Sequence, residues 1–201
     1  MVTLIHTNHG TFGIGNDGVP FQYNVKRTCI HEAGHAVLAY RLGSPVFKIV
    51  VLGFSDEDDD ELNEREFNGL IERPLNADRD NEAVITLAGY YAERIVLDHS
   101  VPRLDIDDIP DGHREEINQA RWMVKSKDET RDFTEAFARV HNKTKNLVMD
   151  NERDIVKVAR ELGVRKCLTA DRVSELLGDF TDHSATTEQQ KQFYREITAL
   201  I

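Results

Sequence analysis

The sequence predicts a mainly helical fold with a small β-sheet, and three features of the chain support this fold class. Apolar residues recur at helical spacing through most of the stretch from residue 84 to residue 177. Residues 46–54 are rich in β-branched and aromatic side chains, as strands are. Hydrophobic residues make up 40% of the 201 residues, which is enough for one domain with its own core.

The first part of the chain is expected to hold one helix and the sheet. A helix should begin near Asn24, which can cap its N-terminus, and end at Gly43. Residues 1–23 before it are rich in glycine, asparagine and threonine, and they are expected to form a loose or strand-like leader. The strand within 46–54 should pair with a second short strand over 67–74 in a small hairpin-like sheet.

The second part of the chain is expected to be helical. Helical spacing and capping residues predict five helices, over residues 83–96, 110–124, 133–148, 155–163 and 169–177. The polar stretch after them is expected to form a terminal helix or to be disordered. The chain therefore divides into a leader of residues 1–23, one domain of residues 24–178 and a tail of residues 179–201.

Charge and composition exclude several classes of partner. The net charge of −11 argues against nucleic acid, because nucleic-acid-binding proteins present a basic surface. A continuous acidic run over residues 56–61 is expected to be a solvated loop. Neither a signal peptide nor an apolar run of about 18 residues is evident, so no membrane partner is expected. With only two cysteines and no disulfide framework, we expect a cytoplasmic protein.

The first predicted helix contains the sequence His31-Glu32-Ala33-Gly34-His35. Residues i and i+4 lie on the same face of a helix, so His31 and His35 can both direct a ring nitrogen at one zinc ion. Glu32 can then take a proton from the zinc-bound water, whose pKa the metal lowers to about 7, and pass it to the leaving amine. The motif predicts a zinc metallopeptidase with zinc-bound water as nucleophile and Glu32 as general base.

Zinc in a catalytic site needs a third protein ligand, and the spacing alone does not select it. Glu93 on a later predicted helix is one candidate, and His113 is a competing one. Cys29 is about 200° around the helix from His31, so we expect it to be a small buried residue and not a ligand. The remaining candidates are the acidic residues before the next helix, Asp105, Asp107, Asp108 and Asp111.

Beyond this motif, the chain resembles the peptidase domain of the FtsH family of ATP-dependent zinc proteases over roughly residues 26 to 177. The resemblance is carried by the metal helix, the strand entry after it, a glycine-containing edge strand, a helix with alanine and glutamate, the helix after the aspartate ligand, and the C-terminal helices. In this sequence these segments are residues 28–37, 44–49, 67–71, 87–95, 120–124 and 151–177.

The resemblance also implies a choice of metal ligands. In the family, the third ligand is an aspartate at the start of the helix that here ends in residues 120–124. Counting back without gaps arrives at Gly112, so a shift of one residue makes Asp111 the ligand, whereas Asp107 and Asp108 need larger shifts. The resemblance therefore implies His31, His35 and Asp111 as zinc ligands, with Glu93 as a helper beside them.

Family members also carry an ATP-driven unfolding domain and usually membrane spans, and this sequence shows neither a P-loop nor a span. We therefore expect an endopeptidase that cleaves peptides or unfolded segments, with the edge strand at Gly69 pairing with the substrate backbone. One alternative is a catalytically inactive, peptidase-like binding or regulatory module. Another is a peptidase subunit that depends on a separate ATPase. Assembly as a homo-oligomer is open, because ring formation in the family relies partly on the ATPase.

Overall fold

The computed structural model of the protein describes residues 3–7, 10–14, 21–53, 67–102, 113–127 and 132–178. Three groups of expectations lie outside these residues: the acidic run 56–61, the tail 179–201, and the four aspartates Asp105, Asp107, Asp108 and Asp111. Within the leader, β1 (Thr3–Thr7) and β2 (Gly10–Ile14) form an antiparallel hairpin.

The helix that carries the His-Glu-x-x-His motif is α1 (Phe21–Arg41). It begins three residues before Asn24, so the expected start is wrong; the added residues are tolerated in a helix, and extending it costs little. Its end is as expected, because Gly43 adopts a φ of 79°. The Ser44 N–H donates to the Ala39 carbonyl at 2.9 Å and the Gly43 N–H to the Tyr40 carbonyl at 3.2 Å, which is a Schellman cap.

The sheet has three antiparallel strands in the order β4-β3-β5. The first two are those expected, β3 (Lys48–Gly53) and β4 (Phe67–Glu72), and Val51 pairs with Gly69 in their register. The third strand, β5 (Cys167–Thr169), was not predicted, since three residues are too few to show an alternating pattern. β4 is thus an edge strand of this sheet.

Five α-helices and one π-helical turn make up the rest of the described chain. These elements are α2 (Arg79–Ala92), the π-helix η1 (Glu93–Leu97), α3 (Arg114–Lys127), α4 (Phe133–Asp150), α5 (Glu152–Arg165) and α6 (Ala170–Leu177). The predicted fold class, mainly helical with a small sheet, is confirmed. None of the described helices has the length and apolar character needed to span a membrane.

Two predicted helix ends need correction. α5 does not close at Gly163 but continues to Arg165, and Lys166 makes the turn with a φ of 63°. A Cβ built on Gly163 would lie 3.8 Å from the sulfur of Cys29, an ordinary van der Waals distance, so the packing of α5 on α1 does not require glycine there. Thr169 precedes α6 as expected, but its side chain makes no capping hydrogen bond.

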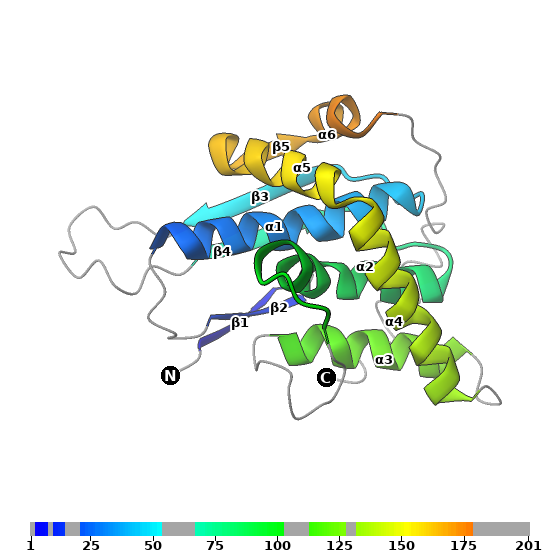
Figure 1. Ribbon diagram of the computed structural model, residues 1–201. Coiled ribbons are helices and arrows are strands. Elements are labelled where there is room, and N and C mark those ends of the chain that lie inside the picture. The colour runs from blue at the N-terminus through cyan, green and yellow to red at the C-terminus, as the bar shows by residue number, and fades with distance from the viewer. Residues whose placement is uncertain are drawn as a thin grey trace.

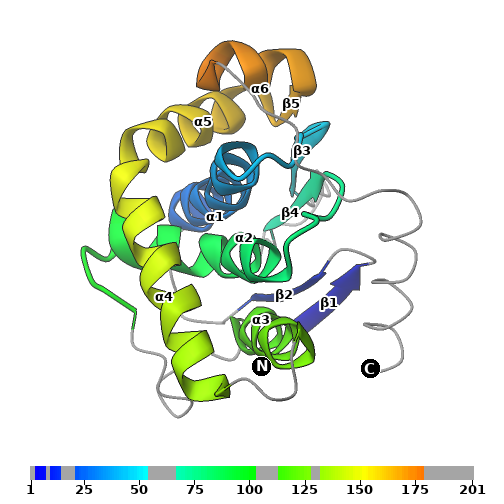
Figure 2. The same cartoon turned by 90° about the vertical axis from the view of Figure 1, so that its right-hand side faces the viewer.

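The helix α1 runs through the middle of the molecule (Figures 1 and 2). α5 packs along one side of it and α2 along the opposite side, while β3 and β4 lie against a third side. α3 and α4 both pack against α2, and the β1–β2 hairpin lies beside α3 (Figure 2). Every residue of α1 from Cys29 to Tyr40 is buried, so the motif is in the protein interior.

Gly34 sets the distance between α1 and α2. A Cβ built on it would lie 2.6 Å from the Cβ of Ala92 and 2.7 Å from the carbonyl oxygen of Ala88. Because one of these atoms belongs to the α2 backbone, a side chain at this position could be accommodated only by moving the two helices apart.

We expect Gly34→Ala and Gly163→Ala to change stability in opposite directions. Both replace a helical glycine, which alone favours alanine by about 1 kcal/mol. Gly34→Ala should nevertheless destabilise the fold by a net of about 1–3 kcal/mol through overpacking, whereas Gly163→Ala has room for its methyl group and should stabilise it. Urea unfolding of the two variants beside the wild type measures both effects, and a Gly34→Ala protein as stable as wild type would contradict this account of the α1–α2 contact.

Candidate metal centre

The two motif histidines lie side by side, and the Nδ1 atom of each ring is already hydrogen-bonded. The Nε2 atoms of His31 and His35 are 3.0 Å apart, and both rings are buried. The Nδ1 of His35 is 2.7 Å from the carbonyl oxygen of Ile85, and the Nδ1 of His31 is 2.7 Å from Oε1 of Glu93. Since a carbonyl or carboxylate oxygen accepts a hydrogen bond, each Nδ1 donates, and in the neutral rings both Nε2 atoms present lone pairs to each other.

Glu116 on α3 completes this group. Its Oε1 lies 2.9 Å from Nε2 of His31 and 3.2 Å from Nε2 of His35. With both rings neutral, three acceptor atoms therefore converge, an arrangement that either a metal ion or a proton on Nε2 of His31 would stabilise. In a tetrahedral zinc site with bonds of about 2.1 Å, ligand atoms are about 3.4 Å apart, and two histidines with one carboxylate are a common catalytic ligand set. The residues present therefore fit a zinc ion with one coordination position left open.

Glu116 is the site residue that sequence reasoning missed. Asp111, the ligand that the resemblance implies, lies outside the described residues. The sequence does contain a signal for Glu116, because it shares the apolar face of its helix with Ile117, Ala120, Met123 and Val124. A carboxylate on a buried helix face requires a charged or metal partner, and this rule identifies Glu116 without any count back from residues 120–124.

Glu93 contacts the Nδ1 side of the His31 ring, and not the Nε2 side where Glu116 and His35 converge. His113 lies against the same ring. Glu93 is buried and holds the Nδ1 of His31, which is the usual way in which a carboxylate orients a metal-binding imidazole. The ring of His113 is stacked on that of His31 at 5.7 Å, and its Nε2 is 3.6 Å from Oε2 of Glu93. His31, Glu93 and His113 could also surround a cation, but Glu93 would then have to give up its bond to His31.

Without a metal, the same histidines and glutamates form ion pairs and shift one another's pKa values. Burial lowers the pKa of His31, but Glu116 and Glu93 outweigh burial and hold this pKa well above its ordinary value. Burial raises the pKa of Glu116, and His31, His113 and His35 outweigh it in turn and hold the pKa well below its ordinary value. Burial lowers the pKa of His113, but Glu93 and Glu116 outweigh burial and raise this pKa to about 9.

Glu32 is almost fully buried, with 1% of its surface exposed. Within the described residues its Oε1 has no hydrogen-bond partner, and burial raises the pKa of its carboxyl although His31 and His35 act in the opposite direction. β4 passes directly over this carboxyl: a Cβ built on Gly69 would lie 2.2 Å from Oε1 of Glu32. Only glycine fits there, and the arrangement leaves a carboxyl suited to proton transfer beside the three acceptor atoms.

A second glycine forms the wall of the site on α2. A Cβ built on Gly89 would lie 2.5 Å from the Nε2 atoms of both His31 and His35. Any side chain at this position would take up the space that the two nitrogens face. Gly89 therefore keeps this side of the two nitrogens open, as Gly69 makes room for Glu32.

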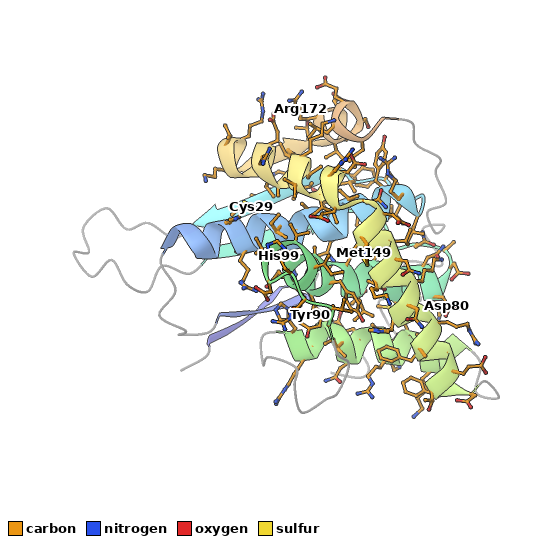
Figure 3. All side chains as sticks on the ribbon, in the orientation of Figure 1. Cys29, Asp80, Tyr90, His99, Met149 and Arg172 are labelled. Atoms are coloured by element: carbon orange, nitrogen blue, oxygen red, sulfur yellow. The ribbon has the colours of Figure 1, made fainter. Side chains whose placement is uncertain are left out.

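Cys29 takes no part in the centre, as expected. It is buried on α1 near α5 (Figure 3), and burial raises the pKa of its thiol to about 11. The neutral thiol is a poor metal ligand and a slow nucleophile at neutral pH.

Replacing Glu116 tests the ligand set directly. We expect Glu116→Gln to lose zinc, from about one ion per chain to a small fraction of that, because a neutral amide binds zinc weakly. The matched control is Glu115→Gln on the same helix, where Glu115 accepts a hydrogen bond from Gln119. Asp111→Asn should also keep its zinc. Elemental analysis of the purified proteins measures the metal, and loss of zinc in Asp111→Asn but not in Glu116→Gln would make Asp111 the ligand.

Glu32→Gln should stabilise the metal-free protein. The pKa of Glu32 is higher in the folded than in the unfolded chain, so its carboxyl costs stability once the pH rises above the ordinary value of 4.5. The gain should therefore be about 1 kcal/mol or more at pH 8 and close to zero near pH 4.5. Urea unfolding in the presence of a chelator measures it at both values, with exposed Glu72→Gln on β4 as the control. Equal stability at pH 8 would show that Glu32 has a partner in solution.

No family model matches the chain, and no curated protein sequence is significantly similar to it. The resemblance to FtsH peptidases therefore rests on the quoted sequence segments alone. The geometry of His31, His35 and Glu116 and the burial of Glu32 beside them support a metal centre independently of that resemblance.

Proposed function

We propose that the protein is a zinc-dependent endopeptidase that hydrolyses peptide bonds in peptides or unfolded segments. His31, His35 and Glu116 would hold the metal, and Glu32 would serve as general base. The observation that carries this proposal is the convergence of the three acceptor atoms, at 2.9–3.2 Å, next to a buried carboxyl that has no hydrogen-bond partner at Oε1 among the described residues. Zinc bound there supplies a Lewis acid that polarises a carbonyl and makes water acidic near neutral pH.

Glu32 performs the proton transfers in this proposal. It takes a proton from the attacking water and passes it to the nitrogen of the leaving amine, so that the C–N bond breaks without forming an amide anion. Burial favours the protonated form of this carboxyl and the neighbouring histidines favour the carboxylate, so the group is suited both to taking up and to releasing a proton. Gly69 makes room for this carboxyl beneath β4.

The other residues of the site orient the two imidazoles and favour extended substrates. Glu93 and the Ile85 carbonyl fix the two imidazoles so that both Nε2 atoms face Glu116. β4, as an edge strand, can accept an extended peptide by strand pairing, which would bring a substrate backbone close to Glu32. Main-chain pairing of this kind favours unfolded or flexible substrates over folded ones.

The more specific proposal is that the fold is that of an FtsH-type peptidase. Its support is the order of the resembling segments: metal helix, strand, glycine-containing edge strand and glutamate-bearing helix, at residues 28–37, 44–49, 67–71 and 87–95. We also propose that this peptidase acts in the cytoplasm. Its further partner would be a second copy of the chain or a separate ATPase.

A second candidate function is a non-catalytic binding module with the same fold. It is favoured by the ion pairs within the centre, because His31 and His113 can satisfy Glu93 and Glu116 without a metal. The two functions differ in two measurable properties, since the module would neither retain zinc nor cleave peptides.

Cleavage of an unfolded substrate separates the two functions. Zinc-loaded wild type should release fluorescence from a dye-quenched unfolded casein, and Glu32→Gln should reduce the rate by about 100-fold or more while keeping its zinc. Elemental analysis of the same samples shows whether the metal is retained. Zinc-loaded wild type without activity, or an active Glu32→Gln protein, would refute the proposed role of Glu32.

A further inference from the structure

We propose that Arg27 is a positioning residue of the metal centre and acts on it through Glu93, and that the π-helical turn η1 provides its second anchor at Asp98. This inference rests on the proposed zinc site. It concerns residues that contact none of the three acceptor atoms, so it can fail while the metal site itself is correct.

Arg27 holds the carboxylate that holds His31. Glu93 uses one oxygen for each partner: Oε1 is 2.7 Å from Nδ1 of His31, and Oε2 is 2.5 Å from Nη1 of Arg27. The side chain of Glu93 is 4% exposed and that of Arg27 is 28% exposed, so the carboxylate end of the pair is shielded from water. The plane of the carboxylate is thereby fixed from both sides.

The guanidinium of Arg27 is itself anchored at a second carboxylate. Its Nη2 lies 3.1 Å from Oδ1 of Asp98, whose other oxygen is 2.8 Å from Nη1 of Arg94. An arginine fork that binds two carboxylates with separate nitrogens is held in orientation as well as in position. Arg27 is therefore restrained where a lysine ammonium would be free to rotate.

The π-helix explains why both carboxylates face Arg27. Glu93 and Asp98 are five residues apart, and in an α-helix such residues point about 140° away from each other. Here the chain widens by one residue, and the N–H of Asp98 donates to the carbonyl of Glu93 at 3.2 Å, the i to i+5 bond of a π-helix. This bond stacks the two residues on one side of the helix, within reach of a single arginine on α1.

The consequence for the metal centre is orientation of His31. With Glu93 fixed, the imidazole donates from Nδ1 and keeps its Nε2 lone pair directed at the other two acceptor atoms. Without Arg27, Glu93 would be a buried carboxylate free to turn toward His113, whose Nε2 is 3.6 Å from its Oε2. His31 would then lose the contact that sets its ring.

The experiment measures zinc affinity of the full chain by competition with a chromogenic chelator. We expect Arg27→Met to bind zinc about 10- to 100-fold more weakly than wild type, which is the usual effect of removing a partner of a ligating histidine. Arg27→Lys keeps the charge but not the fork, and should bind about three- to tenfold more weakly. Arg41→Met is the matched control, because Arg41 lies on the same helix and pairs with Asp154 of α5; its affinity should stay within about twofold of wild type.

A spectroscopic measurement distinguishes orientation from general loosening of the fold. Cobalt-loaded Arg27→Met and Arg27→Lys should show visible absorption bands changed from those of wild type, and cobalt-loaded Arg41→Met should not. If Arg27→Met does not fold, as judged by circular dichroism, the affinity and spectrum of Arg27→Lys decide the question. Unchanged affinity and spectrum in the folded Arg27 variants would overturn this inference while leaving the zinc site intact. A wild type that binds no zinc would overturn both.

Discussion

The close approach of α1 and α2 is the constraint on which the rest of the structure depends. Gly34 of α1 faces α2, and Gly89 of α2 faces α1. Because neither residue has a side chain, the two helices approach closely enough for Ile85 and Glu93 to reach the two histidines. A methyl group at either glycine would meet backbone or the imidazole nitrogens. The same contact that completes the core thus sets the tautomers of the candidate ligands.

Burial of many ionisable groups in one place is the second consequence of this packing. His31, His35, Glu32, Glu93 and Glu116 are all buried, where an unpaired charge costs several kcal/mol. Four of these side chains are paired with one another or with Arg27. Among the described residues, Oε1 of Glu32 and Oε2 of Glu116 have no hydrogen-bond partner. In the proposed function Glu32 is the proton carrier, and a buried carboxyl with a shifted pKa is typical of such groups.

The surroundings of the centre are built from local departures from regular structure. A glycine in β4 lets the strand cross over Glu32, and a π-helical turn after α2 rotates Asp98 to the side of Glu93. Both departures weaken regular secondary structure slightly and are found at functional sites for that reason. In the proposed function, the substrate-facing and the supporting parts of the centre lie on different elements, β4 on one side and η1 on the other.

The sequence by itself determined the elements with a strong period and the residues whose roles follow from spacing. It predicted α1 with its cap at Gly43, the pairing of β3 with β4, the helical second part, and His31, Glu32 and His35 on one helix. The errors of three residues at Asn24 and two residues at Gly163 reflect the small free energy that separates neighbouring helix ends. Three-residue β5 carried no readable pattern.

Only the tertiary structure decided what meets the histidines. Glu116 is 81 residues from His35 along the chain, and its contact with that residue depends on how α3 packs against α2. Glu93 and Asp98 share a partner because of a π turn that helical periodicity does not predict. Long-range contacts of this kind depend on packing and on a one-residue change of helical pitch, and neither is encoded in the local spacing of residues.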